Sequence, residues 1–277
     1  MYNIDKEYDL IDYLQKNRLA KNKVKTYIKL GFIFVNNKKI IKLPYTLYKN
    51  DKLEIKKSEK LPNDLKIIYE DTNYLIIDKE PGLLTISTSN ANKSVEDTLY
   101  KRVREYLNKK HEYCFIVNRI DKETSGLVVF VKNEQLKDNL QNNWNDIVKK
   151  RGYIAVVSGK ITSDGRIDNY LYEDKLTFSH STKHGGKRAI TNYKVLKYND
   201  SYTMLDVNLE TGRKNQIRVH MTEMNHPIIG DKKYYSKDNS LKRLALHHYE
   251  IALIDPITNK LLTFKSEVPN EFYNLFK

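Results

Sequence analysis

Beyond residue 64, short apolar stretches alternate with polar turn residues, and this pattern limits the fold more than any other feature. Strand patterns occur at 65–79, 152–160, 189–198, 201–210, 244–254 and 260–266. Helix patterns are fewer, at 94–107 with Ser94 as the predicted cap, at 133–150 and at 213–224. Many strands with a few separate helices are typical of an α+β domain built on a mixed, mainly antiparallel sheet.

The first 57 residues are predicted to form a separate small domain of helices and strands. Its expected elements are helices at 9–17 and 19–31, the second ending at a Gly31 cap, then strands within 32–40 and at 49–57. A tight turn is predicted at Asn36-Asn37, because Asn tolerates the positive φ that such turns require. Residues 58–64 are polar with one proline and predict a linker, so the larger domain spans 65–277.

Positive charge is concentrated in the first domain. Of the formal net charge of +14, residues 1–60 contribute +8, from 15 basic and 7 acidic side chains. A basic segment favours a partner with a phosphate backbone, although a Lys-, Asn- and Ile-rich chain can be basic without binding one. Three lysines of the second helix follow an i, i+4, i+8 stripe. The residues predicted to contact RNA are Arg18, Lys21, Lys23, Lys25 and Lys29.

Several classes of protein do not fit the composition. No apolar run approaches the roughly 20 residues of a membrane span, and the start "MYNIDKEYDL" has no apolar segment typical of a signal peptide. Cys114 is the only cysteine, which excludes an internal disulfide and indicates a buried structural thiol. We therefore expect a cytoplasmic protein with no membrane partner.

The histidines and glycines predict neither a metal site nor a phosphate loop. His247 and His248 are adjacent in a strand and should face opposite sides, and no cysteine pair completes a ligand set. The "GGKR" stretch at 185–188 lacks the ending of a phosphate loop, so a mobile basic loop is expected there.

The stretch "NRIDKETSGLVVFVKN", at 118–133, carries the strongest candidate for chemistry. It places Arg119 and Asp121 two residues apart, before a small polar turn and an apolar strand. On these residues alone, Asp121 is either ion-paired with Arg119 in a surface turn or a carboxylate that takes part in a reaction.

This stretch resembles the signature H-R-L-D-x-x-T-S-G-L-L of the RluA family of RNA pseudouridine synthases. Other stretches resemble further motifs of that family in the same order, at 67–85, 151–161, 209–234 and 244–269. The resemblance covers residues 65 to 276. It implies an enzyme that isomerises uridine to pseudouridine within RNA, with no cofactor and no metal.

The resemblance also implies roles for individual residues. Asp121 would be the catalytic aspartate, Arg218 its ion-pair partner, and Tyr153 the ring that packs on uracil and handles a proton. An arginine beside the aspartate should favour the ionised carboxylate. Arg119 would fill the gap left by the flipped base. Residues expected to build the substrate pocket are Lys79, Gly82, Thr124, Ser125 and Gly126.

Four positions depart from the family pattern near these motifs. Asn118 and Asn215 stand where histidine is usual, Glu80 replaces a proline, and Asp255 replaces a histidine. None of these changes removes Asp121, Tyr153 or Arg218, so they bear on the target RNA more than on the activity.

The N-terminal segment resembles the RNA-binding domain named after small-subunit ribosomal protein four, through "GFIFVNN" at 31–37 and "NDKLEI" at 50–55. That resemblance favours ribosomal RNA as the substrate, with transfer RNA second, and we expect a monomer. A non-catalytic RNA-binding or assembly factor on the same fold is the alternative. The retained Asp121, Tyr153 and Arg218 favour the enzyme.

Overall fold

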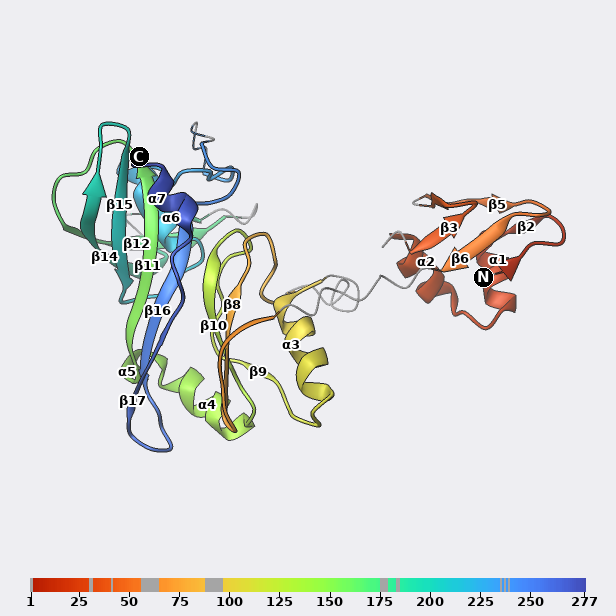
Figure 1. Cartoon of the computed structure of the whole chain (residues 1–277), viewed down its shortest axis with the longest axis horizontal. Helices are drawn as coiled ribbons and strands as arrows, with labels where there is room; N and C mark the ends of the chain where they lie inside the picture. Colours follow the sequence, from red (N-terminus) through yellow and green to blue (C-terminus); the bar gives the residue numbers. More distant parts are fainter. Residues whose placement is uncertain are drawn as a thin grey trace. The chain divides into compact units, whose positions relative to one another are not determined.

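The computed structural model describes residues 2–29, 32–40, 42–55, 65–87, 97–174, 179–182, 185–234, 236, 238 and 240–277. These form two compact units (Figure 1), one up to residue 55 and one from residue 65 onward. The predicted linker 58–64 and the predicted cap Gly31 lie outside the described residues.

The first unit combines two helices with short strands. The helices are α1 (Leu10–Lys16) and α2 (Lys21–Lys29). One sheet has the order β1 (Tyr2–Asn3), β6 (Lys52–Ile55), β3 (Ile33–Val35) and β4 (Lys38–Lys39), and β2 (Tyr8–Asp9) pairs with β5 (Thr46–Leu47). Asn36 and Asn37 have φ of 49° and 64°, which confirms the predicted turn. Leu14, Val24 and Leu53 lie in its apolar core.

The second unit is built on one large sheet. Its strands in spatial order are β13 (Ser179–Thr182), β12 (Gly165–Glu173), β14 (Lys187–Tyr198), β15 (Tyr202–Leu209), β11 (Val148–Ser158), β16 (Leu246–Ile254), β10 (Ser125–Val131), β8 (Tyr74–Lys79) and β7 (Lys66–Glu70). β17 (Leu261–Lys265) pairs with β16, and β9 (Phe115–Ile116) pairs with β10. Only the β10–β16 pair is parallel among the described strands. The predicted α+β class is confirmed.

Helices cover both faces of this sheet. They are α3 (Leu99–Asn108), α4 (Glu134–Asn142), α5 (Trp144–Ile147), α6 (Gln216–Glu223) and α7 (Asn270–Asn274). Apolar side chains of α3 pack on one face of β8 and β10, and those of α4 pack on the other. Because β10 is buried on both faces, its sequence is a continuous apolar run. α6 packs on β11 and β15 through Ile217 and Met221.

Two expectations about this unit are wrong. The stretch around 185–188 is not a mobile loop: Gly185 and Gly186 form a turn with positive φ, and Lys187 and Arg188 begin β14. α3 begins at Leu99, where Thr98 accepts a hydrogen bond from the Lys101 N–H at 3.2 Å. The predicted cap Ser94 lies outside the described residues.

No helix in the part of the chain that the structure describes is long and apolar enough to cross a membrane.

Candidate active site

Asp121 lies in a tight turn at the start of β10. The Thr124 N–H donates to the Asp121 carbonyl at 3.1 Å and closes the turn. Asn118 Oδ1 accepts from the Val129 N–H at 2.7 Å, so this departure from the family pattern ties the loop to β10. Asp121 is therefore held at the end of a fully buried strand.

The end of β8 and the segment after it hold this turn through hydrogen bonds. The Lys122 carbonyl accepts from Lys79 Nζ at 3.0 Å and from the Gly82 N–H at 2.9 Å. Thr85 Oγ1 donates to the Ile120 carbonyl at 2.6 Å. The backbone carbonyls of the two residues next to Asp121, Ile120 and Lys122, are thus fixed by the same part of the chain.

Lys79 is buried beside the Asp121 turn. It is 1% exposed, and Nζ also donates to the carbonyls of Glu80 and Leu83 at 2.8 and 2.7 Å. Burial lowers the pKa of Lys79 to about 7, and the nearby Glu123 carboxylate opposes this shift. The structure places Lys79 and Gly82 against the turn that carries Asp121.

Thr124, Ser125 and Gly126 are buried where β10 meets β16. Ser125 Oγ is hydrogen-bonded to Nδ1 of His247 at 2.8 Å. Gly126 has φ of 111°, and a Cβ there would lie 2.2 Å from the His248 carbonyl oxygen. Glycine is therefore required for the close approach of these two strands. Lys79 and Ser125 also line a cavity of about 800 Å³, whose lining does not include Asp121.

Arg218 of α6 reaches Asp121, although nearly a hundred residues separate them. Arg218 Nη1 lies 3.5 Å from Asp121 Oδ2, and the Asp121 side chain is 28% exposed. Arg119 is exposed and takes part in none of the ion pairs found among the described residues. Of the two candidate partners, the fold brings Arg218 to the carboxylate.

Burial and Arg218 shift the pKa of Asp121 in opposite directions. Burial raises the pKa of Asp121 above its usual range, and the positive charges of Arg218 and Lys233 only partly oppose it. Arg218 lowers this pKa as expected, but burial outweighs it. Arg218 is also shared with another carboxylate, which adds a smaller upward shift.

That carboxylate is Asp231, to which sequence analysis gave no role. Arg218 donates through Nε and Nη2 to the two Asp231 oxygens at 2.8 and 2.7 Å, and through Nη1 to Asn215 Oδ1 at 2.9 Å. Asp231 is 1% exposed. The Gly-Asp pair within the motif at 209–234 was the available signal, but no periodicity links it to Arg218.

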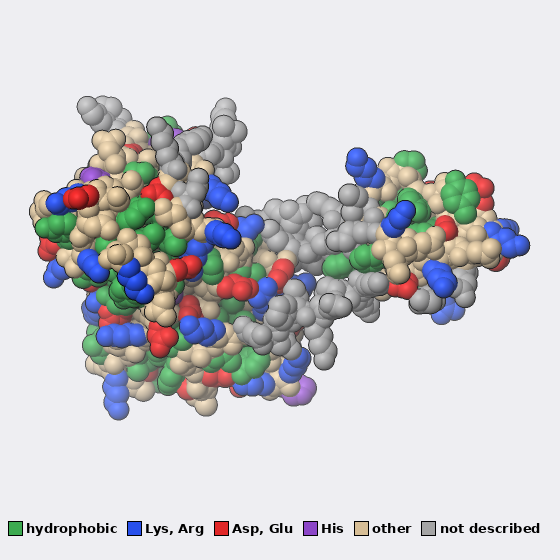
Figure 2. All heavy atoms as spheres, turned by 45° about the horizontal axis from the view of Figure 1, so that its top comes forward, with side chains coloured by type: hydrophobic (Ala, Val, Ile, Leu, Met, Phe, Trp, Pro, Cys, Tyr) green, Lys and Arg blue, Asp and Glu red, His purple; other side chains and the backbone are tan. Residues whose placement is uncertain are grey.

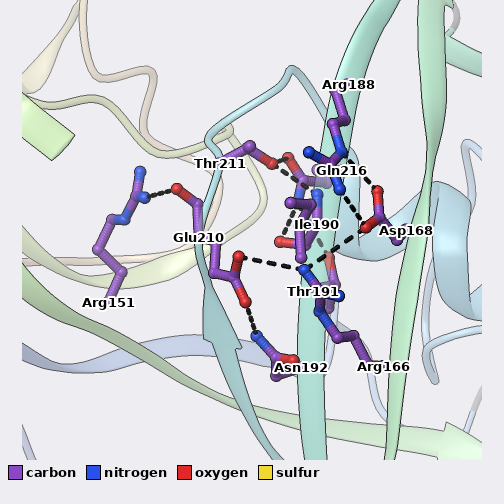
Figure 3. A network of polar contacts seen from close by, with 10 residues as sticks. All are labelled: Arg151, Arg166, Asp168, Arg188, Ile190, Thr191, Asn192, Glu210, Thr211 and Gln216. Carbon is purple, nitrogen blue, oxygen red and sulfur yellow. Dashed lines mark hydrogen bonds and ion pairs between the residues drawn. The ribbon is translucent and has the colours of Figure 1, made fainter.

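A network of polar contacts fixes the start of α6 (Figure 3). Gln216 Nε2 donates to the Ile190 carbonyl at 3.0 Å and to Thr191 Oγ1 at 2.9 Å, while its Oε1 accepts from Thr211 Oγ1 at 2.9 Å. Gln216 is 2% exposed. The helix that carries Arg218 is therefore attached to β14 and to the loop after β15.

Tyr153 of β11 is half-buried and stacks on His248 of β16. The ring centroids are 4.4 Å apart and the planes differ by 14°. His248 Nδ1 donates to the Leu127 carbonyl at 2.7 Å, and burial lowers the pKa of His248 to about 4, so the ring is neutral near pH 7. Burial raises the pKa of Tyr153 and keeps its hydroxyl protonated. As predicted, His247 and His248 face opposite sides of the sheet.

Other sequence-based candidates fall outside this site. Cys114 is buried, and burial raises the pKa of its thiol to about 12, which confirms a structural thiol. Asp255 accepts a hydrogen bond from Tyr74 Oη at 2.7 Å and caps a turn before β17. Within the described residues no three His, Cys, Asp or Glu side chains are grouped to hold a metal.

The basic residues of the first unit are only partly described. Arg18, Lys21 and Lys25 are exposed, whereas the side chains of Lys23 and Lys29 lie outside the description. Figure 2 shows Lys and Arg side chains on the visible surface of both units, interspersed with acidic side chains. The exposed cations of α2 remain candidates for RNA contact.

Comparison with known proteins shows the family to which the chain belongs. Residues 73–223 match the family model of RNA pseudouridylate synthases. An uncharacterized RNA pseudouridine synthase of Bacillus subtilis is 32% identical over 76% of this chain and 71% of its own length. A ribosomal large subunit pseudouridine synthase D of Borreliella burgdorferi is 34% identical over 84% of this chain and 76% of its own length. The chain belongs to the RluA family of RNA pseudouridine synthases.

Solved structures agree on the fold. Human RNA pseudouridylate synthase domain containing 4 superposes with a TM-score of 0.59 over 75% of this chain and 90% of its own, at 22% identity. Human RNA pseudouridylate synthase domain containing 1 superposes with a TM-score of 0.61 over 76% of this chain and 86% of its own, at 18% identity. The second unit therefore has the fold of this family.

Proposed function

We propose that the protein isomerises specific uridines to pseudouridine in ribosomal RNA, with Asp121 as the catalytic carboxylate and without a cofactor. The observation that carries this proposal is the partly exposed Asp121 beside the buried Arg218, on a turn whose Ile120 and Lys122 carbonyls are held by hydrogen bonds. Ribosomal RNA is favoured because several relatives are named ribosomal large subunit pseudouridine synthase D.

The reaction exchanges one bond for another at the same ribose carbon. The bond from C1′ to N1 breaks, the uracil turns, and C1′ joins C5; the C5 proton is lost and N1 gains one. Attack on the ribose and attack on the base both need Asp121 ionised, and Arg218 favours that form. The uracil must stay enclosed between the two steps.

Tyr153 is proposed to pack on the uracil. One face of its ring is occupied by His248, so the base is expected on the other face. Because the hydroxyl is protonated at neutral pH, Tyr153 acts first as a hydrogen-bond donor in the resting enzyme. Lys79, Gly82, Thr124, Ser125 and Gly126 contribute by fixing the catalytic turn and its strand.

RNA binding requires that the target nucleotide leave its helix. Flipping costs a few kcal/mol, and Arg119, which is exposed two residues from Asp121, is proposed to fill the vacated position. We further propose that residues 1–57 form an RNA-binding domain of the ribosomal-protein-four type, joined through 58–64 to a catalytic domain at 65–277. Its exposed cations, with Lys23 and Lys29, would hold the RNA backbone.

The test uses unmodified large-subunit ribosomal RNA that carries tritium at uridine C5. Wild-type protein should release tritium to water as pseudouridine forms. Asp121→Asn, which keeps the shape of the side chain, should bind the RNA nearly as well and release none. Release by this variant at the wild-type rate would overturn the catalytic assignment.

The choice of RNA is tested separately. Bulk transfer RNA labelled in the same way provides the comparison. Faster tritium release from transfer RNA than from ribosomal RNA would show that transfer RNA is the preferred substrate. Tight RNA binding without release from either RNA would instead indicate a non-catalytic binding factor.

A further inference from the structure

Two carboxylates share Arg218 unequally. Asp231 takes two hydrogen bonds, from Nε and Nη2, at 2.8 and 2.7 Å. Asp121 lies 3.5 Å from the remaining nitrogen, Nη1, which also donates to Asn215. A bidentate pair is the strongest arrangement that arginine makes with a carboxylate. The main counter-ion of Arg218 is therefore Asp231.

Asp231 is held rigidly in its own turn. Its Oδ1 accepts from the backbone N–H groups of Lys233 and Tyr234 at 3.0 and 3.1 Å. Gly230 precedes it with φ of 74°, and a Cβ there would lie 2.1 Å from the Arg243 carbonyl oxygen. The Tyr234 ring lies under the guanidinium, 5.2 Å from its carbon. These contacts fix the plane of the guanidinium before any substrate arrives.

We propose that Asp231 is a positioning residue, which holds Arg218 so that Asp121 receives one oriented contact and keeps most of its negative charge available for reaction. A carboxylate in a bidentate pair with arginine is a weaker nucleophile and base than one with a single, longer contact. The inference rests on the proposed function, because it assumes that Asp121 carries the chemistry.

The charged groups around Asp121 predict how its pKa responds when Asp231 is replaced. The groups that face it are Arg218 on α6, Lys233 and Asp231 on the loop after α6, Tyr153 on β11 and Lys79 on β8. Asp231 raises the pKa of Asp121, whereas Arg218 and Lys233 lower it. Removal of the Asp231 charge should therefore lower the pKa of Asp121, both directly and by releasing Arg218 toward it.

Asp231→Asn tests this directly. Its amide nitrogen cannot accept from Arg218, so one of the two fixed contacts is lost and the charge disappears. We expect the single-turnover rate to fall by about a hundredfold. The acidic limb of the pH–rate profile should move to lower pH by about one unit. RNA binding should change less than threefold.

Asp231→Glu keeps the charge but displaces it. Its acidic limb should stay at the wild-type position, while its rate should still fall by about tenfold, because the guanidinium is no longer held in the same plane. This variant keeps the proposal testable if Asp231→Asn does not fold. Full wild-type activity in Asp231→Glu would overturn the positioning role.

The control is Asp255→Asn. Asp255 is also a buried carboxylate that caps a turn, with Thr258 and Tyr74 as partners, and it lies outside the site. It should lose stability without a change in the pH–rate profile. Asp121→Asn is assayed on the same RNA. If Asp121→Asn is active, the proposed function is wrong. If Asp121→Asn is inactive but the pH–rate profile of Asp231→Asn is unshifted, only the inference about Asp231 is wrong.

Discussion

Asp121 is supported from two sides, and the two supports differ in kind. On one side, the end of β8 and the segment after it bind the carbonyls of Ile120 and Lys122, through Lys79, Gly82 and Thr85. On the other side, Arg218 of α6 contacts the carboxylate itself, and Asp231 in the loop after α6 holds Arg218. The first support fixes the position of Asp121 without touching its carboxylate, and the second also shifts the pKa of that carboxylate.

The comparison explains why a buried lysine and a buried arginine lie close to one aspartate. Lys79 donates only to uncharged carbonyls, and its burial lowers its pKa to about 7. Arg218 stays charged, and its fixed carboxylate partner prevents it from neutralising Asp121. Substitutions at Arg218 and at Lys79 can therefore measure the contribution of each support.

The largest effect is expected from Arg218→Met. This change leaves Asp231 buried without its counter-ion, which should cost about 3–5 kcal/mol of unfolding free energy and abolish tritium release. Urea denaturation measures the first and the RNA assay the second. Arg188→Met is the matched control, because Arg188 makes a similar two-point pair with Asp168 on the surface. Equal destabilisation by both variants would contradict the account of a buried ion pair.

Lys79→Met should have a smaller effect on stability. It removes the donor from three carbonyls, one of which keeps the Gly82 N–H, and should cost about 1–3 kcal/mol. The reaction rate should also fall, because the Lys122 peptide beside Asp121 loses a contact, but the pH–rate profile should keep its acidic limb.

The lowered pKa of Lys79 predicts that the stability difference between wild type and Lys79→Met depends on pH. The Lys79 pKa is about 7 in the folded chain and 10.5 for an unperturbed lysine, so between these values the unfolded state binds more protons. Wild-type stability should therefore rise relative to Lys79→Met as the pH increases from about 7 to 10.5. Denaturation at a series of pH values measures this, and a constant difference between the proteins would show that Lys79 is buried as the charged ammonium.

Local patterns predicted much of this molecule. The Asn36-Asn37 turn, the short helix with Arg218 and the buried strand after Asp121 each follow from residues close together in sequence. β12 was missed because Arg166, Asp168 and Tyr170 point outward and leave no apolar run. A strand that is exposed on one side and carries charges there lacks the usual signal.

The charge arrangement of the site could not be predicted in the same way. A motif placed Asp121 and Arg218 together, but the share of Arg218 taken by Asp231 depends on how one loop packs under one helix. Likewise, alternation along β16 predicts that His248 faces away from His247, but only the pairing of β11 with β16 puts it on Tyr153. Such contacts are properties of the tertiary structure.

The smallest effect is expected at His248. It takes part neither in the hydrogen bonds to the Ile120 and Lys122 carbonyls nor in the ion pairs of Arg218. His248→Ala removes the ring behind Tyr153 and should lower the single-turnover rate by about tenfold, the value of one aromatic contact. His248→Phe keeps a ring there and should restore most of that loss. In the Tyr153→Ala background, His248→Ala should have almost no further effect, since its contribution passes through the tyrosine. An undiminished effect in that background would show that His248 acts on the substrate or the fold directly.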